Sequence, residues 1–170
     1  MLDTAYKHPD LTALLSNGRM HEVIGAGGRV FAAHLARALH GPVIWMIVQP
    51  CAERLCPQGL GMIFEPGRLI LITPTDRLAL LQAMEEALRS GAAPLVIGEM
   101  PRRAPDLTES RRLQLAAGTG GARALCLIGE AVTNAAETRW HATPRPGAEA
   151  GHVWELIKNK KGALGTWSLA

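Results

Sequence analysis

Residues 20–31, MHEVIGAGGRVF, contain the pattern on which the fold prediction depends. The apolar pair Val23–Ile24 leads into a glycine cluster, and an apolar segment with helical spacing follows. A strand, a glycine-rich turn and a helix N-terminus in this order are how many α/β proteins bind a phosphate group. The candidate phosphate-binding residues are Gly25, Gly27, Gly28 and Arg29.

The composition indicates one globular domain. The chain has 170 residues, of which 48% are hydrophobic and 19% are charged. A chain of this length usually folds as one domain, and disorder would require a lower hydrophobicity. We therefore expect a single domain over residues 1–170, with residues 1–19 as a peripheral N-terminal segment. The net charge of +3 is compatible with an acidic partner without requiring one.

Two features of the sequence bear on localisation. The N-terminus lacks a basic segment followed by an apolar one, and no apolar run reaches the roughly 18 residues of a membrane span. Cys51, Cys56 and Cys126 lack the paired spacing of a zinc site, so we expect buried, reduced thiols and no metal. Together these features predict a cytoplasmic protein without membrane contact.

Four short apolar runs follow the glycine cluster, as expected for strands that are buried on both faces of a parallel sheet. The runs are residues 43–48 (VIWMIV), 68–73 (RLILIT), 94–98 (PLVIG) and 124–129 (ALCLIG). Helical patterns separate them: residues 29–39, a segment from Thr75 or Asp76 to Gly91, and a segment from Asp106 to Ala117 with Glu109 in capping-box spacing. The middle helix is expected to bury one face, formed by Leu78, Leu81, Met84 or Glu85, and Leu88.

The pattern changes after residue 130. Residues 138–143, 153–158 and 165–169 alternate apolar and polar side chains, which predicts antiparallel strands with one exposed face. The three segments carry Trp140, Trp154 and Trp167, which either pack together as core or serve as interface anchors. The expected fold class is α/β: a mostly parallel sheet flanked by helices, with C-terminal antiparallel strands.

This order of elements resembles the RecA-type core of the P-loop NTPases over most of the chain. The tetrapeptide Arg89-Ser-Gly-Ala92 ends a helix as in RecA, and Glu99 stands where RecA has its Walker B aspartate. Residues 153–160, VWELIKNK, are similar to the RecA strand that ends in K-N-K. Three further segments look like the ImuA family: LTESRRLQLAA at 107–117, TRW at 138–140 and the terminal TWSL.

The resemblance implies a role and a set of partners. ImuA proteins are RecA-like accessory proteins of damage-induced (SOS) mutagenesis. They work with ImuB, an inactive Y-family polymerase homologue, and with an error-prone replicative-type polymerase. The implied function is a cytosolic one in translesion DNA synthesis, through contacts with ImuB, RecA or DNA. The resemblance also carries over an intersubunit role, with self-association, to Lys158 and Lys160. It places a DNA-facing loop at Arg102–Arg103, followed on the next helix by Arg111 and Arg112.

The residues needed for ATP hydrolysis do not align. A Walker A loop requires G-x-x-x-x-G-K-[ST], and aligning Gly28 with its second glycine puts Arg29 at the lysine and Val30 at the hydroxyl residue. We therefore expect no ATPase activity and no resident cofactor, while weak binding of a nucleotide or phosphate at residues 27–29 stays open. Two alternatives are a nucleotide-binding RecA-like ATPase and a cell-division inhibitor resembling SulA.

Overall fold

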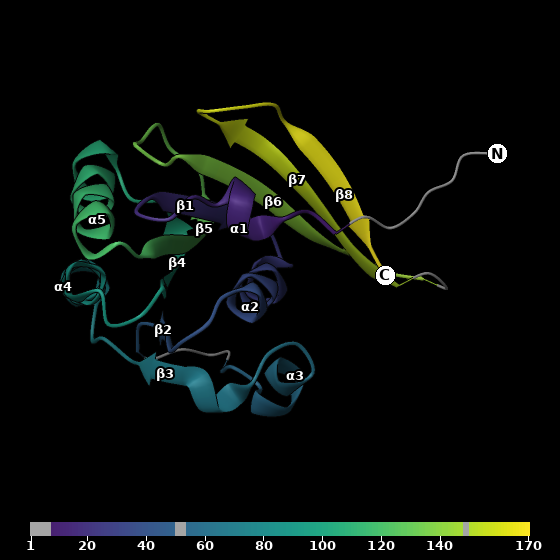
Figure 1. The fold of residues 1–170 in the computed structure, drawn as a ribbon, viewed down its shortest axis with the longest axis horizontal. Helices are drawn as coiled ribbons and strands as arrows, with labels where there is room; N and C mark the ends of the chain where they lie inside the picture. The colour runs from purple at the N-terminus through teal and green to yellow at the C-terminus, as the bar shows by residue number, and fades with distance from the viewer. Residues whose placement is uncertain (1–7, 50–53, 148–149) are drawn as a thin grey trace.

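One eight-stranded sheet forms the centre of the molecule, in the order β3-β2-β4-β5-β1-β6-β7-β8 (Figure 1). The computed structural model describes residues 8–49, 54–147 and 150–170. The strands are β1 (Met20–Ile24), β2 (Val43–Met46), β3 (Leu69–Ile72), β4 (Leu95–Arg103), β5 (Arg123–Glu130), β6 (Thr138–Arg145), β7 (Gly151–Asn159) and β8 (Gly165–Leu169).

The sheet is parallel from β3 to β6 and antiparallel from β6 to β8. The predicted fold class is therefore confirmed, with one correction. β6 was expected to be an antiparallel strand, but it pairs in parallel with β1, with Val23 opposite Trp140. Its alternation of apolar and polar residues reflects one exposed face, because burial alternates from Thr138 to Ala142. Alternation of this kind does not encode strand direction.

Helices cover both faces of the parallel part of the sheet. They are α1 (Leu11–Leu14), α2 (Gly28–Ala38), α3 (Pro57–Gly61), α4 (Arg77–Ser90) and α5 (Leu107–Gly120), with the 3₁₀ turn η1 (Pro66–Arg68). One hydrophobic core contains residues of α1, α2 and α3, and the other contains residues of α4 and α5. Figure 1 shows the two groups on opposite sides of β4 and β5, which is the layered arrangement of an α/β domain.

Helix α4 begins and ends where its sequence predicts, but its buried face matches the predicted one only in part. The Asp76 side chain accepts a hydrogen bond from the Ala79 N–H, and Gly91 closes the helix in the left-handed region with φ +66°. Leu80, Met84 and Leu88 form the buried stripe, whereas the predicted Leu78 is 63% exposed. Met84 determines this orientation because it packs over Gly98, where a Cβ atom would lie 2.2 Å from the Met84 sulfur. The capping box of Asp106 and Glu109 is confirmed.

The C-terminal tryptophans belong mainly to the core. Trp140 and Trp154 are fully buried, and the Phe31 ring lies 5.1 Å from the first and 4.9 Å from the second. Trp167 is partly buried and packs against Trp140 at 5.5 Å. These contacts join α2 to the C-terminal strands, so of the two alternatives for the tryptophans the structure favours packing.

The thiols differ in their surroundings. Cys126 is buried in β5 as expected, whereas Cys56 is exposed and caps the short helix α3. Cys51 lies outside the described residues.

Candidate functional site

The glycine turn at residues 25–28 connects β1 to α2 and is pressed against β6. Gly25 has φ +106°, and a Cβ atom on it would lie 2.5 Å from the Ala142 carbonyl oxygen. A Cβ atom on Gly27 would lie 3.0 Å from the same oxygen. The Gly27 N–H donates to the Ala142 carbonyl at 2.9 Å, and the Gly28 N–H donates to the Gly25 carbonyl at 3.1 Å. Two N–H groups of the turn are thus already bonded within the protein.

Arg29 and Glu99 lie together at this turn. The guanidinium binds the carboxylate through two hydrogen bonds, Nε to Oε1 at 2.8 Å and Nη2 to Oε2 at 2.9 Å. Trp45 on β2 donates its indole N–H to the same Oε1 at 3.0 Å. The Arg29 and Glu99 side chains are 28% and 14% exposed. Bidentate arginine–carboxylate pairs of this geometry are the stronger kind of charged hydrogen bond.

A hollow of about 210 Å³ opens between the turn and the C-terminal ends of β4 and β5. Gly25, Arg29, Glu99 and Pro101 are among its lining residues. The one cation and the one carboxylate of this lining bind each other, so an entering anion would compete with Glu99 for Arg29. Sequence reasoning selected both charged residues but missed Trp45. Its indole N–H is the only polar side-chain group of strand β2.

Lys158 and Lys160 contact the segment of residues 131–137, which crosses from β5 to β6. The Lys158 ammonium donates to the Asn134 carbonyl at 3.2 Å, and the Lys160 ammonium donates to the Ala135 carbonyl at 2.8 Å. Burial lowers the pKa of Lys158, and the neighbouring positive charges of Arg139 and Lys160 lower it further. Both lysines therefore bind their own chain.

A buried polar cluster lies under residues 131–137, and sequence reasoning missed it. Glu22 on β1 is fully buried, and its Oε2 accepts a hydrogen bond from the Arg139 Nε at 2.7 Å. The Asn134 side-chain N–H₂ donates to Glu22 Oε1 and, at 2.8 Å, to the Pro105 carbonyl. A carboxylate within a buried strand requires such partners, and that requirement was the signal available in the sequence.

The predicted DNA-contacting arginines fall into two sets, which differ in whether the side chain binds a carboxylate of its own chain. Arg102 and Arg103 were expected in a loop, but they are the last residues of β4, which pairs with β5 as far as Arg103 and Glu130. Arg103 pairs with Glu109 at 3.1 Å, and Arg112 pairs with Glu85 at 2.7 Å. Arg102 and Arg111 are exposed.

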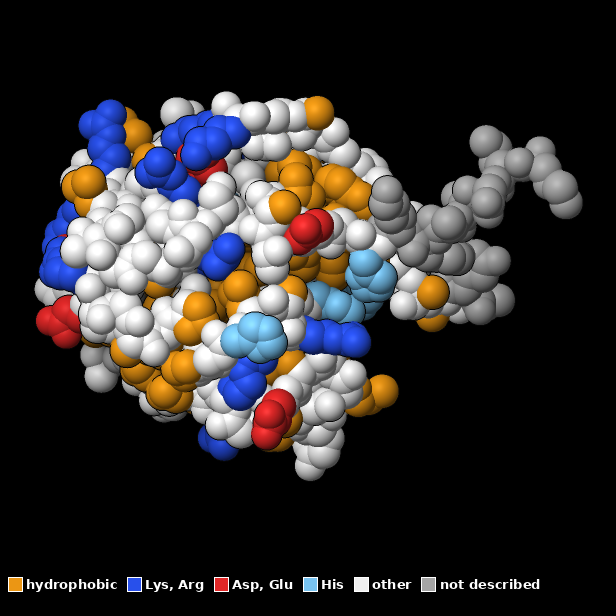
Figure 2. Space-filling model, in the orientation of Figure 1, with side chains coloured by type: hydrophobic (Ala, Val, Ile, Leu, Met, Phe, Trp, Pro, Cys, Tyr) orange, Lys and Arg blue, Asp and Glu red, His pale blue; other side chains and the backbone are white. Residues whose placement is uncertain are grey.

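Lys and Arg side chains form a group near α5. Figure 2 shows this group at the upper left, over α5 and the neighbouring loops, with further Lys and Arg side chains lower on the same face. Glu109 lies there among arginines. Burial alone would raise the pKa of Glu109, but hydrogen bonds from Arg77, the Asp106 backbone and Arg103 lower it to about 2. That carboxylate is therefore ionised and neutralises part of the positive surface.

Two classes of feature are missing from the part of the chain that the structure describes. There, no three His, Cys, Asp or Glu side chains lie close enough together to hold a metal ion. The helices in the same ranges lack the length and hydropathy of a membrane-spanning helix.

Comparison with known proteins bears on the ImuA resemblance. No protein-family model matches the chain. Protein ImuA of Caulobacter vibrioides, in strains NA1000 / CB15N and ATCC 19089 / CB 15, is 35% identical over 111 residues. The match covers 58% of this chain and 44% of each ImuA, so the chain spans less than half the length of these curated relatives. The predicted resemblance is therefore confirmed: the chain is similar, at a distance, to ImuA.

Proposed function

We propose that this chain is a non-catalytic, RecA-like accessory protein of SOS mutagenesis and translesion DNA synthesis. It acts through contacts with ImuB, RecA or DNA, within a complex that includes an error-prone polymerase. Sequence similarity to ImuA supports the process, and the bidentate Arg29–Glu99 pair is the observation that carries the non-catalytic part.

The pair opposes nucleotide chemistry because it engages both charges that such chemistry would use. In a P-loop enzyme a lysine binds the phosphates, and a carboxylate on a neighbouring strand serves the metal. Here the residues at the corresponding places, Arg29 and Glu99, bind each other. A nucleotide would have to separate them, and breaking a largely buried ion pair costs a few kcal/mol. Val30 also offers no hydroxyl group for Mg²⁺.

Equilibrium binding of ATP tests the non-catalytic assignment. Titration calorimetry with ATP and Mg²⁺ is expected to show no Mg²⁺-dependent binding in the micromolar range. Micromolar affinity that disappears when Mg²⁺ is chelated would instead support the nucleotide-binding alternative.

A pull-down from DNA-damaged cells tests the assigned process. ImuB or RecA is expected among the captured proteins, and both are scored explicitly. Capture of the tubulin-like division protein in their absence would favour the alternative of a SulA-like division inhibitor.

A further inference from the structure

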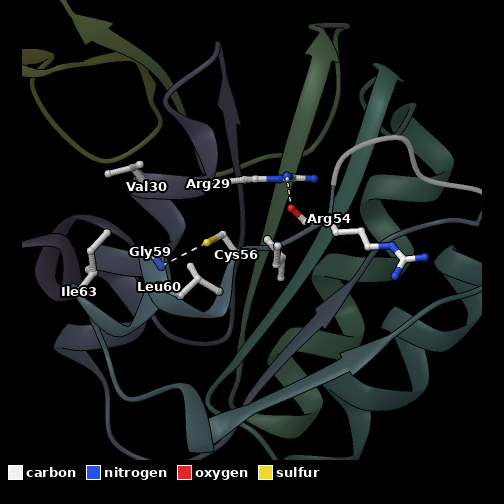
Figure 3. A pocket seen from close by; sticks show the side chains of 8 residues that line it. Arg29, Val30, Arg54, Cys56, Gly59, Leu60 and Ile63 are labelled. Carbon is white, nitrogen blue, oxygen red and sulfur yellow. Dashed lines mark hydrogen bonds between the residues drawn. The ribbon is translucent and has the colours of Figure 1, made fainter.

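A second pocket lies beside the glycine turn, between the first turn of α2 and helix α3 (Figure 3). Its volume is about 270 Å³. Val30, Leu55, Leu60 and Ile63 give it apolar walls, and the Cys56 side chain lines it between them. The pocket shares Arg29 with the hollow at the glycine turn.

The pocket has an apolar end and a cationic end. Val30, Leu60 and Ile63 lie at one end in Figure 3, and the Arg54 side chain extends from the other, beside Arg29. Among the described residues, its lining includes no acidic and no aromatic side chain. Glu99 neutralises Arg29 from outside the lining, so among the residues that the structure describes the charge of Arg54 is left in excess at the cationic end.

The volume and the lining of the pocket indicate which kind of group can bind in it. Pockets for whole drug-sized ligands are usually larger, about 300–1,000 Å³, so the pocket suits one large apolar side chain better than a whole nucleotide. No aromatic ring among the described lining residues offers a base a stacking surface, and Arg29, the cation at the glycine turn, is held by Glu99. An apolar side chain flanked by carboxylates complements both ends of the pocket.

We infer that this pocket is a docking site for a partner protein, which inserts a large apolar side chain flanked by acidic residues. The inference deepens the proposed function by naming the surface and the chemistry of the partner segment, and it rests on that function to the extent that the protein works through partners. Apolar anchors in a pocket with a charged rim are the usual source of affinity in such contacts.

Cys56 supplies a direct readout, because an occupant would shield its thiol. The rate of alkylation by N-ethylmaleimide is followed at Cys56 by peptide mapping after cleavage at Glu53, which separates Cys56 from Cys51 in the sequence. The probe is the peptide acetyl-DLFE-amide, and its matched control is acetyl-KLFK-amide. At about ten times its Kd, the acidic peptide is expected to slow alkylation about tenfold, because only the free protein reacts.

Charge reversal separates docking from non-specific shielding. Arg54→Glu is expected to remove protection by the acidic peptide and to confer protection by the basic one. Arg37→Glu, an exposed reversal near the end of α2 and outside the pocket lining, is expected to change neither. Equal protection by both peptides, no protection, or protection by ATP with Mg²⁺ would overturn the docking site. A partner captured equally well by wild type and Arg54→Glu would overturn it too, while leaving the proposed function intact; capture of no partner by wild type would count against that function itself.

Discussion

Two arginine–carboxylate pairs lie along β1 and just past it, but the pairs differ in burial. In the middle of the strand, Glu22 is fully buried and its partner Arg139 is 15% exposed. Past the glycine turn, Arg29 and Glu99 are 28% and 14% exposed and border a hollow. The first pair joins β1, β6 and residues 131–137, whereas the second joins α2 to β4 and β2. We therefore expect the first to determine stability and the second to determine what the hollow can bind.

The largest effect on stability is expected for the buried pair of Glu22 and Arg139. Arg139→Leu leaves the Glu22 carboxylate buried without its cation, and removing one partner of a buried pair typically costs about 3–5 kcal/mol. Urea unfolding measures the loss of unfolding free energy. The control is Arg89→Ala, which removes an exposed pair with Glu85 and should cost no more than about 0.5 kcal/mol. Equal losses in the two variants would refute the distinction by burial.

A pH titration probes the same buried strand, β1, through His21. Burial lowers the pKa of His21 from its ordinary 6.5 to about 4, so the imidazole stays neutral in the folded protein. Below about pH 6.5 the unfolded chain gains a proton that the folded protein takes up only near pH 4. The free energy of unfolding should therefore decrease by about 2 kcal/mol between pH 7 and pH 5 through this group.

One control variant isolates His21 from the other histidines. His34, whose pKa burial also lowers to about 4, acts in the same direction. The comparison is therefore between wild type and His21→Gln, whose pH dependence should be smaller by the amount assigned to His21. An NMR titration that placed the pKa of His21 near 6.5 would contradict the prediction.

The Arg29–Glu99 pair should show a smaller energetic coupling. A double-mutant cycle with Arg29→Met and Glu99→Gln is expected to give a coupling energy of about 1–2 kcal/mol, because hydrogen bonds to charged groups contribute in this range. The measurement is urea unfolding of the four proteins. A coupling near zero would mean that Glu99 does not hold Arg29 strongly, and it would weaken the case against nucleotide binding.

Sequence reasoning reached the parallel core and the individual charged residues, but not the contacts between them. Uninterrupted apolar runs identify β2, β4 and β5 because both faces of these strands are covered. The run of β3 was expected to be buried in the same way, but β3 is an edge strand and leaves Ile70 48% and Leu71 50% exposed. The pairing of Arg29 with Glu99 spans 70 residues, and a local pattern carries no information about such a contact. The direction of β6 and part of the buried face of α4 were missed for the same reason: neighbouring β1 and Gly98 determine them.

The lysines at the end of β7 test whether the polar cluster also serves an interface. Lys158→Glu with Lys160→Glu is expected to weaken self-association or association with RecA-family proteins while the domain stays folded. The lost bonds to the carbonyls of Asn134 and Ala135 should cost about 1 kcal/mol of stability. Sedimentation velocity, pull-down and circular dichroism are the measurements. Unchanged association would restrict the two lysines to holding residues 131–137 in place.

The smallest effect is expected for the arginines of α5 and β4, and it should follow their pairing. Arg102→Ala with Arg111→Ala removes exposed cations, whereas Arg103→Ala with Arg112→Ala removes exposed cations that already bind Glu109 and Glu85. If this surface contacts DNA phosphates, the first double variant should lower affinity for non-specific DNA more than the second. It should also reduce the dependence of affinity on salt by up to about two phosphate contacts. Fluorescence anisotropy over a salt series measures both quantities. Equal losses in the two variants would show that ion pairing within the chain does not decide which arginines are available, and unchanged binding in both would place DNA elsewhere on the protein.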